Sequence, residues 1–583
     1  MESTRITLIL CALLVFQVPG FSQVDTVTIL HVNDTHSNLG TLGSRDASLD
    51  GKLGGLARAA SFIGSLKRTT PTALLLHAGD ISIGDLFYTK YFAVAELQLL
   101  LGLGFDAVTL GNHDFDLGPA PLQQMLDKAF AAGSFPVLSA NAVLDDPAVH
   151  GLKKHVSAYA IKHVGTRTVG IFGLTTPSTN LISNPAPVVL DTNIVPIAAA
   201  MVDTLKRRGC DVIICLSHLG LTLDRLLAGY VPGIHLIVGG HDHYLLGKAV
   251  HALDPAGDTT WIVQANAFYM NVGLVRLRVD GREVRLVECT PVPIDRSVPK
   301  EPTTEAVVNG MVAGIESGYG PFFTRQVATV GSFFKEVPDS LTAPGWKDTP
   351  IGNLVTDAYR AALGTQIAIQ GGGSTAQPLY PGPIVSADLF RVVGYGFNTD
   401  NGLGYHLARF EMKGSDLLAG LEFGLSAIEE NDEYLLQVSG MSYEYAPGNQ
   451  PFKRVDRKDV KIGRAVLDPA AVYTIGANEF VPMFLSAIGI PYAKLHVFSG
   501  DTTEFQTLLA YAISSGTLWP KTEGRVQAIR ATSTDGGAWI PLDFQLNQDT
   551  PDPFNPEISI AFTLGTPVHA LLRPYCSVNR LRR

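Results

Sequence analysis

The 583-residue sequence is too long for one ordinary hydrophobic core, so we expect roughly two to four domains. Hydrophobic residues make up 46% of it and charged residues 17%, a globular composition that excludes an intrinsically disordered chain. The formal net charge of −10 argues against binding of a nucleic-acid polymer, which needs a basic surface. A small anionic substrate is compatible with this charge, because a bound metal can outweigh it locally.

Residues 1–22 have the pattern of a signal peptide. Arg5 precedes the apolar stretch Ile6–Val15, and small or turn-forming residues follow as far as Ser22. The stretch is too short to span a bilayer, and the sequence contains no second candidate. We therefore predict an exported protein without a transmembrane segment, located in the periplasm, on the cell surface or in the medium. A buried N-terminal helix is the alternative interpretation.

Residues 23–296 are predicted to form an α/β domain. Short apolar runs end abruptly in polar residues there, and helix-like segments follow them. The runs are Val27–Val32, Ala73–Leu76, Ala107–Leu110, Val169–Leu174, Asp211–Leu216 and Ile234–Val238. Continuous apolar runs of this length are typical of strands that are buried on both faces.

A cluster of prolines between Pro291 and Pro302 marks the end of this domain. Residues 297–325 are predicted to be a linker that contains a connecting helix, Glu305–Ser317. A second, α+β domain is expected over residues 326–531, and it opens with a short strand. Two of its helices are expected at Ile351–Leu363 and Ser415–Ile428.

The last residues, 532–583, differ in composition from the two domains. Ser, Thr, Gly and Asp form a linker, and an alternating strand is expected at Ile558–Phe562. This pattern predicts a small β-module attached by a flexible tether.

Clusters of polar residues follow five of the predicted strands. They span His31–His36, His77–Asp80, Gly111–Asp116, Ser217–His218 and Gly239–His243. Because ligands of open α/β sheets bind at the carboxyl ends of the strands, we expect the five clusters to converge on one crevice. Convergence would bring together seven candidate ligands: Asp34, His36, Asp80, Asn112, His218, His241 and His243.

These seven side chains predict a pair of metal ions. Imidazole and carboxylate groups together suit Zn, Mn or Fe, and seven ligands are too many for one ion. They suit two divalent ions that share a carboxylate, an arrangement that clamps the attacking and leaving oxygens of an in-line displacement and supplies hydroxide near neutral pH. Glycines beside the ligands allow the turns to approach the ions. They are Gly79, Gly111, Gly239 and Gly240.

In this order, the segments DTH, GD, GNHDFD, SHLG and GGHDH resemble the calcineurin-like metallophosphoesterases, and more narrowly the secreted 5′-nucleotidase family. The resemblance covers about residues 26–530, because the second region contains further family marks at Pro350–Leu354, Gly371–Gly373 and Gln437–Gly440. It implies a four-layer α/β-β/α sandwich followed by a 5′-nucleotidase C-terminal domain that binds the substrate.

The resemblance also implies a role for each candidate residue. One metal ion is implied at Asp34, His36 and His243, and the other at Asn112, His218 and His241, with Asp80 bridging them. It further implies that His113 pairs with Asp116, where an imidazolium could stabilise developing charge and protonate the leaving oxygen. A structural neighbour of Asn112 is the alternative interpretation of His113.

The second domain departs from the family pattern where a nucleoside would bind. The usual asparagine and arginine of the glycine-rich motif are Gln370 and Thr375, the usual aromatic residue before QVSG is Leu435, and no GGDG turn follows Asn478. Since stacking on each base contributes about 1–3 kcal/mol, we expect weak selection among bases. Tyr434, Phe480 or Tyr492 could replace the missing rings. We assign substrate contacts to Gly371, Gly372, Gly373, Tyr434 and Phe480.

The tail segment Gln548–Phe562 resembles the C-terminal sorting module of Bacteroidetes-type secreted proteins. This resemblance implies a secretion machinery as a partner, and a plain β-rich tail is the alternative.

Three functions are consistent with the sequence. The leading hypothesis is an exported 5′-nucleotidase-like phosphohydrolase that releases phosphate from nucleoside monophosphates or related nucleotides. A second retains the metals but acts as a phosphodiesterase, a UDP-sugar hydrolase or a sulfur-ester hydrolase. The third is a non-catalytic surface binding protein. The pair His113 and Asp116 favours an enzyme, because a structural metal site needs no additional acid.

Overall fold

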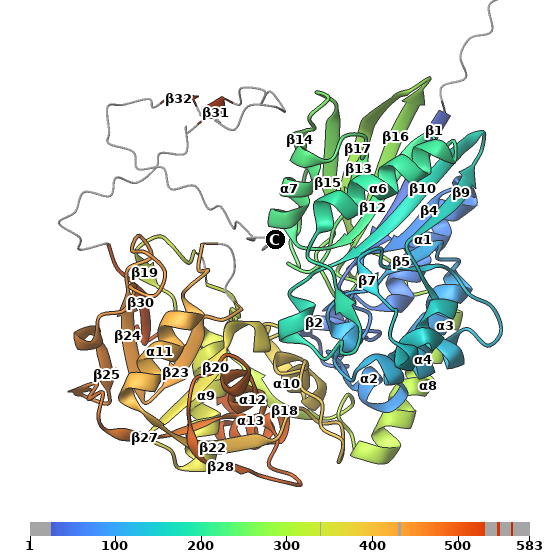
Figure 1. Ribbon diagram of the computed structural model, residues 1–583. Helices are drawn as coiled ribbons and strands as arrows, with labels where there is room; N and C mark the ends of the chain where they lie inside the picture. Colours follow the sequence, from blue (N-terminus) through green and yellow to red (C-terminus); the bar gives the residue numbers. More distant parts are fainter. Residues whose placement is uncertain (1–24, 339, 430–432, 531–544, 548–560, 564–583) are drawn as a thin grey trace, which may run out of the picture.

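The computed structural model describes residues 25–338, 340–429, 433–530, 545–547 and 561–563. The first domain, blue to green in Figure 1, lies beside the second domain, which is yellow to red. The predicted signal peptide and most of the predicted tail lie outside the described residues. From the tail, β31 (Gln545–Asn547) and β32 (Ala561–Thr563) form an antiparallel pair. No helix in the described part of the chain has the length and apolarity that a membrane span requires.

Two sheets form the centre of the first domain. The seven-stranded sheet has the order β17-β16-β1-β4-β5-β6-β8, and the six-stranded sheet has the order β14-β15-β13-β12-β10-β9. The strands of the first sheet are β1 (Asp25–Val32), β4 (Leu74–His77), β5 (Ala107–Thr109), β6 (Val137–Leu138), β8 (Val156–Ser157), β16 (Asn271–Asp280) and β17 (Glu283–Pro293). Those of the second are β9 (Tyr159–Val164), β10 (Arg167–Thr175), β12 (Val212–His218), β13 (Leu236–Val238), β14 (Val250–Leu253) and β15 (Thr259–Val263).

The two sheets pack face to face, and helices cover their outer faces. Along β1, Val27 and Ile29 are buried against the second sheet, whereas Leu30 and Val32 face the helices on the other side. This alternation follows from the period of two in a strand. Helices α1 (Leu56–Thr69), α3 (Val94–Leu103) and α4 (Pro119–Ala129) cover the first sheet, and α6 (Ile194–Arg207) and α7 (Leu221–Tyr230) cover the second. The predicted four-layer sandwich is confirmed.

Each of the six predicted apolar runs lies on a strand of these sheets. The predicted connecting helix lies within α8 (Pro302–Tyr319). Pro302 occupies the first turn, where its missing N–H is not needed, and the Glu301 side chain accepts hydrogen bonds from the first free backbone N–H groups. The shorter elements of this domain are α2 (Leu86–Tyr91), α5 (Thr179–Ile182) and the strand pairs β2 (Leu42–Arg45) with β3 (Gly51–Leu53) and β7 (Ala142–Val143) with β11 (Val189–Leu190).

The second domain contains three small sheets. Their strand orders are β23-β20-β27-β22-β28, β19-β30-β24-β25-β26 and β21-β18-β29. The strands are β18 (Gln326–Val330), β19 (Gly345–Trp346), β20 (Ile367–Gly371), β21 (Gly382–Val385), β22 (Leu407–Lys413), β23 (Leu436–Ser439), β24 (Met441–Tyr445), β25 (Val460–Ile462), β26 (Ala465–Val466), β27 (Val472–Asn478), β28 (Ala493–Val497), β29 (Thr517–Leu518) and β30 (Val526–Ala528). The helices are α9 (Pro350–Leu363), α10 (Ser386–Val392), α11 (Gly414–Gly424), α12 (Phe480–Ala487) and α13 (Glu504–Ser515).

The predicted helices of this domain are present, and one is shorter than predicted. Helix α9 begins after Thr349, whose hydroxyl accepts a hydrogen bond from a backbone N–H of the first turn, and Gly364 ends it in a left-handed conformation. Helix α11 ends at Gly424, although the apolar pattern extends to Ile428. The pattern continues because Leu425 and Ile428 are buried in the turns that follow the helix.

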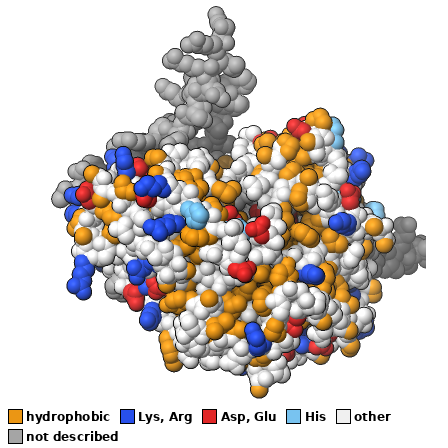
Figure 2. Space-filling model, turned by 90° about the horizontal axis from the view of Figure 1, so that it is seen from below, with side chains coloured by type: hydrophobic (Ala, Val, Ile, Leu, Met, Phe, Trp, Pro, Cys, Tyr) orange, Lys and Arg blue, Asp and Glu red, His pale blue; other side chains and the backbone are white. Residues whose placement is uncertain are grey.

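Buried polar contacts join the two domains. Arg391 Nε donates to Asp85 Oδ2 at 2.6 Å, and Arg45 donates to both carboxylate oxygens of Asp388 at 2.7 and 2.6 Å. Arg45 ends β2 and Asp85 directly precedes α2, so these pairs hold helix α10 against the first domain. On the face shown in Figure 2, a few acidic side chains lie near the middle, and side chains of both charges are scattered over the rest of the face.

Candidate active site

The five predicted polar clusters meet at one end of the sandwich. Three of them follow the parallel strands β1, β4 and β5 of the first sheet, and two follow the parallel strands β12 and β13 of the second. The clusters therefore lie at carboxyl ends of strands, as the sequence predicts. Both stacked sheets of the sandwich contribute clusters to the site.

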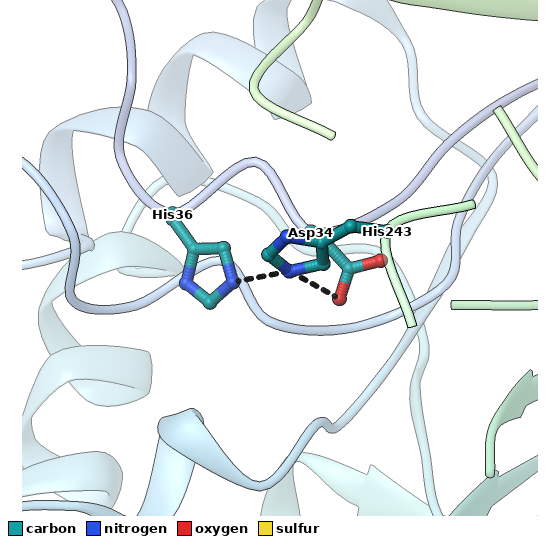
Figure 3. Close-up of side chains that lie close together, drawn as sticks. All are labelled: Asp34, His36 and His243. Carbon is teal, nitrogen blue, oxygen red and sulfur yellow. Dashed lines mark hydrogen bonds and ion pairs between the residues drawn. The ribbon is translucent and has the colours of Figure 1, made fainter. Parts of the chain in front are cut away.

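The first group of candidate ligands consists of Asp34, His36 and His243 (Figure 3). The Nε2 atoms of the two histidines are 3.2 Å apart, and His243 Nε2 is 3.7 Å from Asp34 Oδ1. One ligand atom from each residue lies within 4.8 Å of the others, so the three side chains could hold one metal ion.

The second group consists of Asp80, His218 and His241, and Asn112 lies beside it. His218 Nε2 is 3.0 Å from Asp80 Oδ2 and 3.2 Å from Asn112 Oδ1. The same Asp80 oxygen is 3.8 Å from His36 Nε2 of the first group. Asp80 therefore lies between the two groups, in the position of a shared carboxylate.

The histidine tautomers fit metal ligation. His36 Nδ1 donates to the Ser82 carbonyl oxygen at 3.2 Å, and His218 Nδ1 donates to the Ala78 carbonyl oxygen at 2.7 Å. A carbonyl only accepts, so each Nδ1 carries a proton and Nε2 is the nitrogen left to ligate a metal. The two Nε2 atoms face carboxylate oxygens, and such a set of imidazole and carboxylate donors suits a divalent cation.

The backbone is left-handed at five of the seven candidate ligands. Their φ angles are 50° at Asp34, 47° at His36, 57° at Asp80, 80° at His241 and 57° at His243. Such conformations cost on the order of 1–3 kcal/mol each for non-glycine residues and occur where surrounding structure enforces them. Here backbone hydrogen bonds between the first two loops, such as the one from the Asp34 N–H to the Gly79 carbonyl at 2.9 Å, hold the strained turns.

Two glycines lie so close to the ligands that no side chain fits. A Cβ at Gly111 would lie 2.0 Å from Asp80 Oδ1, and one at Gly79 would lie 2.5 Å from His218 Nδ1. This agrees with the expectation that glycines allow the turns to approach the site. It also explains why the strands β4 and β5 can place the loops that follow them in direct contact.

The electrostatics of the site favour positive charge. Burial raises the pKa of Asp34 to about 7. Burial lowers the pKa of His218, but the carboxylates of Asp80 and Asp34 outweigh it and raise that pKa to about 10. The same negative potential would stabilise a divalent cation, and the cation would offset the free-energy cost of burying these carboxylates.

His113 and Asp116 form the predicted pair at the edge of the two groups. His113 Nδ1 is 2.6 Å from Asp116 Oδ2, and Asp116 Oδ1 accepts a hydrogen bond from Ser183 Oγ at 2.7 Å. Burial lowers the pKa of His113, but Asp116 and Asp80 outweigh it and raise the pKa to about 9. The ring stacks on Tyr395 of the second domain, with centroids 4.5 Å apart.

A cavity of about 630 Å³ extends from these residues into the second domain. All five residues assigned to substrate contacts line it: Gly371, Gly372, Gly373, Tyr434 and Phe480. Tyr492 instead packs on Phe410, with ring centroids 5.6 Å apart. Thr375 donates its hydroxyl to the Gly372 carbonyl at 2.8 Å, which stabilises the glycine turn.

Several residues of the site were not predicted. Asn33 Nδ2 donates to Asp34 Oδ2 at 2.6 Å, and Asp114 accepts from the backbone N–H groups of Gly111 and Ser82 at 2.9 and 3.2 Å. Both lie inside the motifs, so their polar character could have revealed them. The helical spacing from Phe480 could likewise have revealed Phe484. The cavity is also lined by Tyr395, Tyr405, Phe423 and Glu433, for which the sequence offered no comparable signal.

The chain is similar to known phosphoesterases along most of its length. Residues 27–245 match the calcineurin-like phosphoesterase family, and residues 330–492 match the 5′-nucleotidase, C-terminal domain family. The 5′-nucleotidase of Bos taurus is 27% identical over 539 residues, which cover 86% of this chain and 90% of that protein.

Solved structures show the same likeness. The crystal structure of a 5′-nucleotidase precursor from Thermus thermophilus has a TM-score of 0.76 and 28% identity, covering 87% of this chain and 100% of the other. The sulfate thiohydrolase SoxB of Thermus thermophilus shares the fold, with a TM-score of 0.72 at 19% identity over 88% of this chain and 98% of the other.

We predict that Gly111→Ala lowers the metal content of the protein. The added Cβ would lie 2.0 Å from Asp80 Oδ1 and displace the carboxylate that lies between both ligand groups. Gly229→Ala is the matched control, because a Cβ there would meet nothing within 4 Å. Asp80→Ala is expected to be the most damaging ligand change. Elemental analysis of purified protein tests this, and two ions per chain in Gly111→Ala would contradict it.

Proposed function

We propose that this chain, which belongs to the 5′-nucleotidase family and contains both of its domains, is an exported phosphohydrolase with two divalent metal ions. It would release phosphate from nucleoside monophosphates or related esters. The observation that carries the proposal is the arrangement of two groups of metal-type donors beside the His113–Asp116 pair. The pair and members of both groups, such as His243 and Asp80, line one cavity.

The two ions are assigned to the two donor groups. One would be held by Asp34, His36 and His243, and the other by Asn112, His218 and His241, with Asp80 shared. When bound, two such ions neutralise phosphate oxygens and lower the pKa of water toward neutrality. Zn and Mn suit this mixture of imidazole and oxygen donors.

His113 is assigned to protonation of the leaving oxygen. Its Nδ1 proton is engaged by Asp116, so Nε2 is the nitrogen that can deliver a proton to an ester oxygen in the cavity. Ser183 orients the Asp116 carboxylate, and the ring contact with Tyr395 fixes the plane of the imidazole. The pair thus has the two features of a positioned acid, a charged partner and a restricted orientation.

The second domain is assigned to binding of the organic part of the ester. The turn Gly371–Gly373 and the rings of Tyr434 and Phe480 line the cavity together with members of the donor groups. Apolar surface of this kind suits a nucleoside or another ring-containing alcohol. A phosphodiester, a sugar nucleotide or a sulfur ester on the same scaffold would be an alternative substrate.

Measuring the phosphate released from each ester distinguishes between these substrate classes. We expect activity on the four common nucleoside monophosphates and on ribose 5-phosphate, and its loss after removal of metal by a chelator. Thr375 lacks the guanidinium group that could form two hydrogen bonds to a substrate, and no GGDG turn presents an aromatic ring. The kcat/KM values of these substrates should therefore lie within roughly tenfold of one another, about 1.4 kcal/mol.

A preference above roughly a hundredfold for one base would show that the cavity contains a specific base clamp. Activity confined to diesters or sulfur esters would replace the substrate class. Full activity with one ion or none per chain would overturn the two-metal assignment. Metal binding without hydrolysis of any ester would favour a binding protein.

We predict that His113→Ala retains both ions and lowers kcat on a nucleoside monophosphate by roughly 10²–10⁴-fold, the usual contribution of a positioned acid. The loss should be smaller on 4-nitrophenyl phosphate, whose leaving group needs little protonation. His251→Ala, an exposed position on β14, serves as the control. An equal loss on both substrates would exclude leaving-group protonation as the role of His113.

Export is proposed from residues 1–22, and use of a secretion machinery from the resemblance of residues 548–562 to a sorting module. Among the relatives is a snake venom 5′-nucleotidase from Naja atra, 27% identical. We expect the mature protein outside the cytoplasm with an N-terminus near Gln23. N-terminal sequencing of fractionated cells tests this, and an intact Met1 in the cytoplasmic fraction would refute it.

A further inference from the structure

One part of the cavity lining is a set of aromatic rings that contact one another. We call Tyr405, Phe423, Tyr434, Phe480 and Phe484 the aromatic wall. Three neighbouring pairs are stacked, with centroids 5.8 Å apart for Tyr405 and Phe480, 6.0 Å for Phe480 and Phe484, and 5.6 Å for Phe484 and Tyr434. Phe423 meets Tyr434 and Phe484 edge-on, at 6.0 and 5.7 Å.

These spacings leave no room for a flat ring between the members of a stacked pair. A planar group between two rings would need them about 7 Å apart, since each stacking contact takes about 3.5 Å. The three stacked pairs of the aromatic wall are closer than that. All five are nonetheless partly exposed, so the aromatic wall offers the cavity a continuous apolar surface rather than a clamp.

Apart from the imidazole of His113, the charged side chains that line the cavity are acidic. Glu433 and Glu336 of the second domain line it together with Asp116, and Glu433 Oε1 is 3.6 Å from His241 Nε2. Among the described lining residues there is no lysine or arginine. Glu433 thus contacts a donor residue and directly precedes Tyr434 of the aromatic wall, so its carboxylate lies where the donor groups and the aromatic wall meet.

Glu433 is fixed in this place by the glycine turn. The Gly373 N–H donates to the Glu433 carbonyl at 2.9 Å, and a Cβ at Gly373 would lie 3.1 Å from Glu433 Cβ. Its side chain is 28% exposed, so it is partly shielded from bulk water. A carboxylate in such a place acts on a nearby charge more strongly than one on the open surface.

We propose that the cavity selects its ester by charge. It would accept phosphomonoesters of uncharged or cationic alcohols with an apolar body, and it would disfavour alcohols that carry a second anionic group, such as a carboxylate or a further phosphate. The metal ions held by the donor groups would bind the one phosphate, and the aromatic wall would receive the apolar body. A cation on that body would be stabilised by both the rings and the carboxylates. This inference rests on the proposed phosphohydrolase function.

Three benzyl phosphates test the proposal with the metal-loaded full chain. They carry a 4-carbamoyl group, a 4-carboxylate of the same shape, or a 4-aminomethyl cation, and the methylene group separates these substituents from the scissile bond. We expect kcat/KM for the carboxylate to be at least about tenfold below that for the carbamoyl ester, and the cation to equal or exceed the carbamoyl ester, as fixed carboxylates in a partly shielded cavity require. Added salt should reduce the difference.

The variant Glu336→Gln/Glu433→Gln should reduce the carbamoyl-to-carboxylate ratio to within about threefold, and the exposed control Glu283→Gln should leave it unchanged. Circular dichroism and metal content establish that each variant is folded. If the double variant does not fold, the single variant Glu336→Gln is expected to lower the ratio in the same direction.

Equal rates on the carboxylate and carbamoyl esters, or a ratio that the glutamine variants do not change, would overturn charge selection. That result is distinct from failure of the proposed function, in which none of the three esters, nor any nucleotide, would release phosphate. If only charge selection is wrong, all three esters are hydrolysed at similar rates. If the proposed function is wrong, no ester is hydrolysed, and both proposals are contradicted.

Discussion

The site depends on the position of a single buried carboxylate, that of Asp80. Its oxygens lie within hydrogen-bond distance of His218 Nε2 and the His113 backbone N–H, and 3.8 Å from His36 Nε2. The carboxylate reaches this point because the turn after β4 is left-handed and because Gly111 has no side chain to block it. A buried carboxylate is stable only with such partners or a cation. The remaining ligands are therefore arranged around it from the ends of two sheets.

The features that were predictable from the sequence are those with a local cause. Buried strands need apolar runs, and the polar residues that end them, such as Asp34 or His241, are visible as motifs. The apolar runs do not show whether their strands form one sheet or two, since that depends on which strands pair across the fold. The two sheets were implied by the family resemblance alone. Tyr395 and Glu433 were not visible either, because they reach the cavity only through packing of the second domain. The overlong helix prediction at Ile428 failed because burial continues in the turns after Gly424.

Packing between the domains determines how the second domain completes the site. Arg391 is almost fully buried and pairs with Asp85, and Gln377 Nε2 donates to Asn38 Oδ1 at 2.9 Å. Leaving either member of such a buried pair without its partner would be strongly destabilising, so these contacts hold the domains in register. Tyr395 follows helix α10, which carries Arg391, and its ring stacks on His113. The ion pairs at the interface thus position a side chain of one domain against the proposed acid of the other.

The residues of the site are divided between the two domains. The donor groups and His113 belong to the first domain. The loops that carry them have left-handed backbone and pack against glycines that leave no room for a side chain, so they tolerate little change. The aromatic wall and Glu433 belong to the second domain, where rings pack on one another and can be exchanged without moving a ligand. The second domain can therefore depart from the family pattern without disturbing the donors. Gln370 and Thr375 stand where that pattern has asparagine and arginine, while every donor position of the first domain has a side chain able to ligate a metal.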